Sequence, residues 1–91
     1  MAKFNVIRIV DGDTFDVSPD WRWNGTSGSR VRPAGYDAAE RATQAGSAAT
    51  QHLASLILGK TVELGTAYRV DHARLVCEVL FNGHNLKDDF N

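Results

Sequence analysis

The chain has 91 residues and a mass of 10.0 kDa, which is enough for one compact domain. Its composition, 43% hydrophobic and 23% charged, is typical of a globular protein and excludes a disordered, collagen-like or disulfide-rich chain. Ten Lys and Arg residues balance eleven Asp and Glu, and the pI of about 6.2 argues against a broad cationic surface. Because seven of the ten cations are Arg, we expect a few aimed bidentate contacts with phosphate or carboxylate groups.

Cysteine content and the N-terminal segment narrow the class of protein further. Cys77 is the only cysteine, so the chain forms no internal disulfide and no thiolate zinc site. Met1–Val10 has a strand-like pattern and lacks the apolar core of a signal peptide, so the sequence leaves the compartment open. No apolar run approaches the roughly 18 residues that a membrane helix needs.

Three strands are predicted in the first part of the chain, over Phe4–Val10, Thr14–Ser18 and Arg30–Gly35. Residues 19–20 interrupt the second strand, and 21–23 resume it. The Gly- and Ser-rich segment Asn24–Ser29 is predicted as a hairpin loop.

One amphipathic helix is predicted over Thr43–Leu58. Its apolar residues recur at helical spacing, as Ala49, Leu53, Leu56 and Ile57. Gly46 disfavours the helix, which predicts an effective start near Ser47. Gly59 is placed to end it in the left-handed conformation.

Two more strands follow, over Thr61–Thr66 and Leu75–Phe81, and the second is closed by an Asn82-Gly83 turn. Leu86–Asn91 is predicted to begin another helix. The element order predicts a mainly β fold with one helix (α+β), a five-stranded OB-fold barrel with the helix between strands three and four. We expect residues 1–91 to form this single domain.

Polar clusters coincide with the predicted strand ends and loops. They are Asp11-Gly12-Asp13-Thr14, Arg32, Asp37-Ala38-Ala39-Glu40 and Asp71-His72-Ala73-Arg74. Oxygens that converge from separate loops suit a hard divalent cation. Two well-spaced arginines suit the transition state of a phosphodiester reaction.

These clusters resemble the staphylococcal nuclease (thermonuclease) family, in order and approximate spacing, across about residues 6 to 86. The matching residues are Val10-Asp11-Gly12-Asp13-Thr14-Phe15, Val31-Arg32, Tyr36-Asp37-Ala38-Ala39-Glu40, Leu58-Gly59-Lys60-Thr61-Val62, Asp71 and Arg74-Leu75. Each motif is weak alone, and the ordered set carries the resemblance.

The resemblance implies a calcium-dependent phosphodiesterase that acts on DNA and RNA, in single-stranded or unpaired regions. The implied Ca²⁺ ligands are the carboxylates of Asp13 and Asp37 and the backbone carbonyl of Ala38. Glu40 matches the carboxylate that activates or orients the attacking water. Two positions, Arg32 and Arg74, match the arginines that hold the scissile phosphate.

The chain departs from the family pattern at three places. Ala39 replaces the proline usual before the catalytic Glu, and the loop before Arg74 is one residue shorter, with Ala73 where Gly is common. The further C-terminal helices of the family have no counterpart before Asn91, so we expect weakened substrate affinity and reduced activity. There are thus two alternatives to an active nuclease. The chain could be a non-catalytic module that binds nucleic acid or protein, or an inactive truncated nuclease fragment.

Each candidate residue also has a purely structural interpretation. Asp37 and Glu40 could cap the following helix, and Arg32 could form a surface ion pair. Asp11 and Asp16 are interpreted as solvated turn residues. We interpret His52 as a partly buried core residue. We expect Trp21 and Trp23 to pack across strands rather than to stack on bases.

Overall fold

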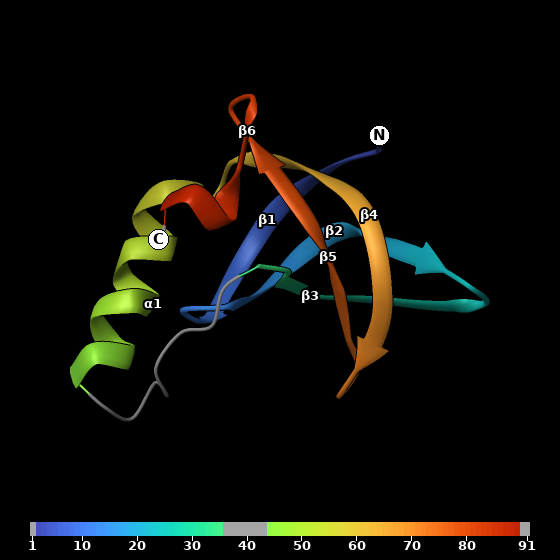
Figure 1. The fold of residues 1–91 in the computed structure, drawn as a ribbon, viewed down its shortest axis with the longest axis horizontal. Helices are drawn as coiled ribbons and strands as arrows, with labels where there is room; N and C mark the ends of the chain where they lie inside the picture. Colours follow the sequence, from blue (N-terminus) through green and yellow to red (C-terminus); the bar gives the residue numbers. More distant parts are fainter. Residues whose placement is uncertain (1, 36–43, 90–91) are drawn as a thin grey trace.

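The computed structural model describes residues 2–35 and 44–89, which form a closed β-barrel with one helix (Figure 1). The barrel strands are β1 (Ala2–Asp11), β2 (Thr14–Trp23), β3 (Thr26–Pro33), β4 (Thr61–Asp71) and β5 (Arg74–Phe81). Antiparallel pairs join β3–β2–β1–β4–β5, and a parallel pairing of β3 with β5 closes the circle. Helix α1 (Gln44–Ile57) lies between β3 and β4 in the chain. The predicted five-stranded OB-fold barrel is therefore confirmed.

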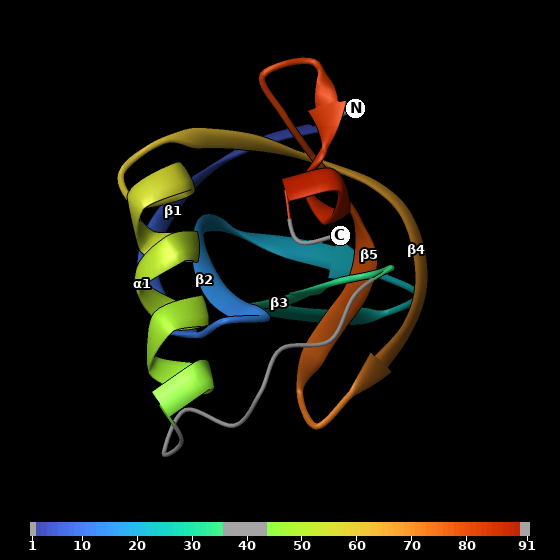
Figure 2. The ribbon, with the colours of Figure 1, turned by 60° about the vertical axis from the view of Figure 1, so that its left-hand side comes forward.

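Helix α1 packs its apolar stripe on one end of the barrel, beside β1 (Figure 2). Leu53 and Ile57 are fully buried, and Gly59 ends the helical segment at a φ of 75°, as predicted. The expected late start at Ser47 is wrong: Gly46 lies within the helix, where its carbonyl accepts a hydrogen bond from the Thr50 hydroxyl at 2.8 Å. Within the described residues, no helix is long and apolar enough to cross a membrane.

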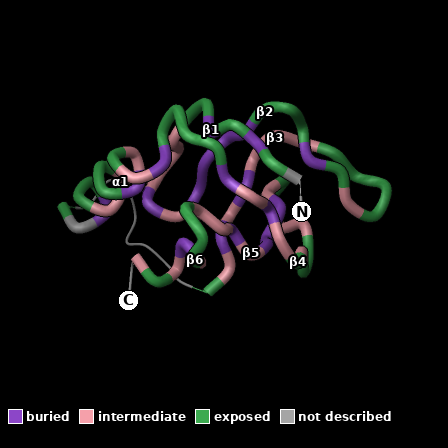
Figure 3. Tube along the Cα trace, turned by 90° about the horizontal axis from the view of Figure 1, so that it is seen from above, coloured by how far each residue is buried: buried purple, intermediate pink, exposed green. Residues whose placement is uncertain are grey.

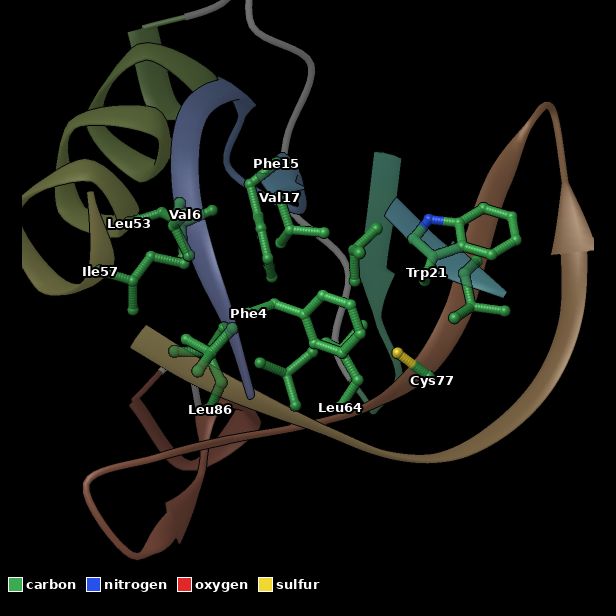
Figure 4. Close-up of a cluster of buried hydrophobic side chains, with 14 residues drawn as sticks. Phe4, Val6, Phe15, Val17, Trp21, Leu53, Ile57, Leu64, Cys77 and Leu86 are labelled. Atoms are coloured by element: carbon green, nitrogen blue, oxygen red, sulfur yellow. The ribbon is translucent and has the colours of Figure 1, made fainter. Parts of the chain in front are cut away.

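The core fills the barrel from end to end (Figure 4). Leu53 and Ile57 lie beside Val6 at the helical end, and Trp21 lies toward the other. Alternation in β1 and β2 produces this core, because inward side chains such as Val6 and Val17 alternate with exposed or polar neighbours.

Several strand boundaries differ from the prediction, and for β3 and β4 the reason is that the connecting turns are very tight. β2 continues through Pro19 to Trp23, with an irregular register between Asp16 and Trp21 instead of a break. The expected loop Asn24–Ser29 is reduced to the turn Asn24-Gly25, and β3 begins at Thr26. β4 extends to Asp71 rather than ending at Thr66. The tip of the β2–β3 hairpin is largely exposed (Figure 3).

Three side chains occupy environments that bear on the sequence interpretation. Asp16 is buried and pairs with Arg30 (Nε to Oδ1, 3.0 Å), so its assignment as a solvated turn residue is wrong. Trp21 is buried, and its Nε1 donates to the carbonyl of Arg30 at 2.8 Å, which confirms cross-strand packing. His52 is exposed on α1, contrary to the expected partial core position, and its ring lies 3.1 Å from the Asp89 carbonyl.

The chain after β5 folds back toward α1. The short strand β6 (His84–Asn85) pairs with β5, and the 3-10 helix η1 (Leu86–Asp89) follows it. The helical turn predicted from Leu86 onward is therefore present as a 3-10 turn. Leu86 is fully buried and joins the core at the helical end.

Candidate active site

The β1–β2 turn presents two aspartates at one rim of the barrel. Asp11 and Thr14 are cross-strand partners that leave Gly12-Asp13 as the turn. The amide of Asp13 donates to Oδ1 of Asp11 at 3.1 Å, so the Asp11 side chain fixes the local backbone. Asp13 Oδ1 accepts a hydrogen bond from the Thr14 hydroxyl at 3.2 Å. Asp11, which was expected to be a solvated turn residue, is instead the half-buried last residue of β1, where its side chain fixes the turn. Asp13 is held by its neighbours.

Arg32 reaches this turn from the end of β3. Its Nη2 lies 3.5 Å from Oδ2 of Asp13, and the two side chains are 20% and 14% exposed. Since the pair is largely shielded from solvent, its attraction is less screened than that of a surface pair. The interpretation of Arg32 as an ordinary surface ion pair therefore does not describe its surroundings.

Arg74 reaches the same turn from the β4–β5 hairpin. Its Nη1 lies 3.4 Å from the Thr14 hydroxyl oxygen, and its Nε donates to the backbone carbonyl of Asp71 at 3.3 Å. The Asp71 carboxylate lies 3.8 Å from Nη2. Asp71 therefore orients Arg74, and the short hairpin loop does not prevent Arg74 from reaching the rim.

These contacts join three separate segments of the chain into one cluster, which we call the rim site: Asp11, Asp13, Thr14, Arg32, Asp71 and Arg74. In OB-folds, the loops between strands one and two and between strands four and five form the usual surface for oligonucleotides. The rim site occupies these two loops together with the end of β3.

The two aspartates of the turn raise the local density of negative charge. Burial raises the pKa of Asp11 above its ordinary value, and the neighbouring Asp13 side chain raises it further. A carboxyl whose pKa is raised by a second carboxyl favours a cation nearby.

The turn supplies oxygen donors of the type that a hard divalent cation takes, but too few to hold one alone. Carboxylate and hydroxyl oxygens from Asp11, Asp13 and Thr14 are the ligand type that Ca²⁺ takes, although Ca²⁺ requires six to eight ligands. Within residues 2–35 and 44–89, no three His, Cys, Asp or Glu side chains form a group that could hold a metal ion. The other predicted site residues, Asp37, Ala38 and Glu40, lie outside the described residues.

Sequence reasoning missed one member of the site. Thr14 appears in the Asp-Gly-Asp-Thr motif, but no role follows from the motif alone. In the structure its hydroxyl is buried between Asp13 and Arg74 and links the acidic turn to the second arginine. The burial of Thr14 beside Asp13 would have indicated this role, but it could not be predicted from the sequence.

Comparison with protein-family models and with curated proteins finds no match for this chain.

Proposed function

We propose that the protein is a calcium-dependent nuclease that hydrolyses phosphodiester bonds of DNA and RNA. The observation that carries the proposal is the convergence of Arg32 and Arg74 on the single turn that holds Asp13. An anionic phosphodiester resists attack by water, so its hydrolysis requires positive charge placed where the transition state gathers negative charge.

The two guanidinium groups supply directed donors for such a phosphate. An arginine has five N–H donors in a planar fork, which matches two phosphate oxygens at once. Asp71 and Thr14 hold Arg74, and Asp13 holds Arg32, so both forks are pre-positioned. Pre-positioned donors do not have to reorganise when charge develops on the phosphate.

A Ca²⁺ ion bound through Asp13, together with Asp37 and the Ala38 carbonyl, would polarise a phosphoryl oxygen. Glu40 would accept a proton from the attacking water as the general base, a role that is typically worth about 10²–10⁴-fold. The ion-pair partner of Arg32 and the metal-binding carboxylate would then be the same residue, Asp13, which links the metal to the phosphate arginine.

The test is cleavage of denatured DNA by the purified protein in calcium, with a chelator as the control. We expect calcium-dependent cleavage in the wild type and a loss of at least about 100-fold in Glu40→Gln. Glu63→Gln is the matched control, because Glu63 is a half-buried carboxylate on β4 outside the rim site. This variant should retain wild-type turnover.

Other outcomes separate the competing functions. Calcium binding without cleavage by the folded wild type would indicate an inactive nuclease fragment. Binding of DNA with neither calcium dependence nor cleavage would indicate a non-catalytic module and overturn the proposal.

A further inference from the structure

A hollow of about 340 Å³ adjoins Arg32 on the outer face of the barrel. Its lining comes from β3, β4 and β5 and includes Arg32, Gly35, Tyr68, Arg69 and Val76. The volume lies within the range of small-ligand sites, at about 300–1,000 Å³. The hollow therefore extends away from the phosphate arginine along the side of the barrel.

A β-bulge in β4 places two adjacent side chains in this hollow. Ala67 pairs with Cys77 and Arg69 pairs with Val76, so Tyr68 is an extra residue on β4. Adjacent residues of a regular strand point to opposite faces, but a bulge turns both to the same side. Tyr68 and Arg69 are accordingly both exposed, and both line the hollow.

Arg32 and Arg69 lie in one row across three strands. Val76 of β5 is the partner of Arg32 on one side and of Arg69 on the other. Two strand spacings separate the backbones of the two arginines by roughly 10 Å. Two cations are thus aligned across one hollow, one of them in the rim site.

The ring of Tyr68 is fixed and partly uncovered. Its hydroxyl donates to Oε2 of Glu78 at 3.0 Å, and Oε1 of Glu78 accepts from Asn85 Nδ2 at 2.7 Å. The side chain remains 53% exposed. An aromatic ring with a fixed orientation loses little entropy when a base stacks on it. Glu78 accepts both hydrogen bonds and is not among the residues that line the hollow.

A third cationic side chain borders the hollow at Gly35. The aliphatic carbons of Lys87 lie across this glycine, where a Cβ would meet Lys87 Cδ at 2.6 Å. The long stem of a lysine covers apolar surface while its charged end remains hydrated. The stem of Lys87 therefore covers Gly35 beside the hollow.

We infer that the Tyr68–Arg69 bulge is a second nucleotide position for a single-stranded polynucleotide, next to the phosphate held at Arg32. Arg69 contacts a neighbouring phosphate and Tyr68 stacks on an unpaired base. The inference rests on the proposed nuclease function and adds to it a preference for substrates with at least two phosphodiesters. A duplex is disfavoured, because its bases are stacked on one another and do not offer a free face to Tyr68.

The first test measures binding without cleavage, by fluorescence anisotropy of a labelled single-stranded oligonucleotide in chelator. Tyr68→Ala and Arg69→Ala should each raise the Kd by about 5- to 20-fold, the range expected for one stacked base or one phosphate contact. Tyr68→Phe keeps the stacking ring but loses its hydrogen bond to Glu78, so it should raise the Kd by less than Tyr68→Ala does. Arg22→Ala is the matched arginine control, because Arg22 is exposed on the β2–β3 hairpin, away from the hollow.

The second test measures turnover in calcium on a dinucleotide with one phosphodiester and on a trinucleotide with two. The wild type should have the lower KM for the trinucleotide, and Arg69→Ala should abolish this difference while kcat stays within about twofold. Equal KM values in the wild type, or unchanged binding in both Tyr68→Ala and Arg69→Ala, would overturn the inference.

The two proposals fail in distinguishable ways. If the wild type cleaves DNA and Arg69→Ala is indistinguishable from it, the nuclease stands and the second position is wrong. If the wild type binds the oligonucleotide through Tyr68 and Arg69 but never cleaves it, the binding surface stands and the nuclease is wrong. A wild type that neither binds nor cleaves overturns both.

Discussion

At the level of single residues, the two arginines of the rim site are held by different partners. Arg74 uses Nε on the Asp71 carbonyl and Nη1 on the Thr14 hydroxyl, whereas Arg32 faces the carboxylate of Asp13. The arrangement of Arg74 thus uses more than one nitrogen of a planar group. A lysine at either position would retain the charge but would lose the guanidinium fork that can bind two phosphate oxygens at once.

We therefore predict that Arg32→Lys and Arg74→Lys each lower kcat/KM for DNA cleavage by about 10²-fold, similar to the loss of one oriented donor in other enzymes. The measurement is initial rates on denatured DNA in calcium. Arg22→Lys on the exposed hairpin is the control and should be unchanged. Wild-type rates in both rim-site variants would show that charge alone suffices and would exclude the bidentate role.

Among the site residues, sequence reasoning identified those whose chemistry is explicit in their motif. Asp13, Arg32 and Arg74 were expected at strand ends, and the structure brings them together. Thr14 and Tyr68 could not be predicted in the same way. The role of Thr14 depends on its contact with Arg74, which is 60 residues away in the sequence. The exposure of Tyr68 depends on a β-bulge, and no local sequence pattern specifies the register of that bulge.

At the level of elements, the β4–β5 hairpin turns through two non-glycine residues with positive φ. His72 and Ala73 have φ values of 52° and 61°. The left-handed conformation costs an alanine roughly 1–2 kcal/mol, because its Cβ approaches the following carbonyl oxygen. This turn directly precedes Arg74, so backbone strain lies next to the site.

Replacing Ala73 with glycine should relieve this strain. We predict that Ala73→Gly raises the free energy of unfolding by about 0.5 kcal/mol, after the greater entropy of glycine in the unfolded chain is subtracted. Urea denaturation measures the change. Ala48→Gly on the exposed face of α1 is the control, and it should lower the free energy of unfolding by about 1 kcal/mol. A loss of stability in Ala73→Gly would contradict this account of the turn.

A second element, η1, is attached to the body of the protein through Asp89. The Asp89 carboxylate lies 2.8 Å from Nε2 of His84 in β6, and its carbonyl lies 3.1 Å from Nε2 of His52 on α1. The hydrogen bond to Asp89 raises the pKa of His84, and the charges of Asp89 and Asp88 act in the same direction. Protonated His84 is thus favoured by the folded state.

This attachment predicts a defined pH dependence. The pKa of His84 is higher in the folded protein than in the unfolded chain, where it is near 6.5. The His84–Asp89 pair therefore stabilises the folded state fully below pH 6.5, and this stabilisation is lost as the pH rises through the pKa of the folded protein. Between about pH 6 and pH 8, the wild type should therefore lose more stability than His84→Gln or Asp89→Asn. The measurement is urea denaturation across this range. Parallel pH profiles for all three proteins would exclude the role of this pair.

Element types were easier to predict from the sequence than element ends. The spacing of Leu53 and Ile57 located α1, because both side chains have to face the core. The end of β4 was missed because the His72-Ala73 turn has no composition signal of its own. The start of β3 was missed although Asn24-Gly25 is a typical hairpin turn, because the small polar residues that follow it resemble a loop. Pro19 did not end β2, because the strand accommodates it within an irregular stretch of register.

At the level of the whole molecule, closure of the barrel creates the site. The parallel pairing of β3 with β5 places Val31 opposite Leu75 and brings the end of β3 to the β4–β5 hairpin. No local sequence pattern encodes this pairing, since it joins segments more than forty residues apart. The OB-fold topology was predictable from element order, and the topology then determines which polar clusters converge.

The net charge of −1 limits how the proposed nuclease could bind nucleic acid. A protein that relied on a broad cationic surface would release many counterions, and its affinity would fall steeply with salt. Contacts limited to Arg32, Arg74 and Arg69 correspond to about three phosphates, which predicts a slope of about −2 for log K against log salt on single strands. Anisotropy titrations in chelator between 50 and 200 mM salt would measure the slope. Arg69→Ala should reduce it by about 0.7, and Arg22→Ala should leave it unchanged. A slope near −5 would mean that cations well beyond these three take part, so affinity would not depend on aimed contacts.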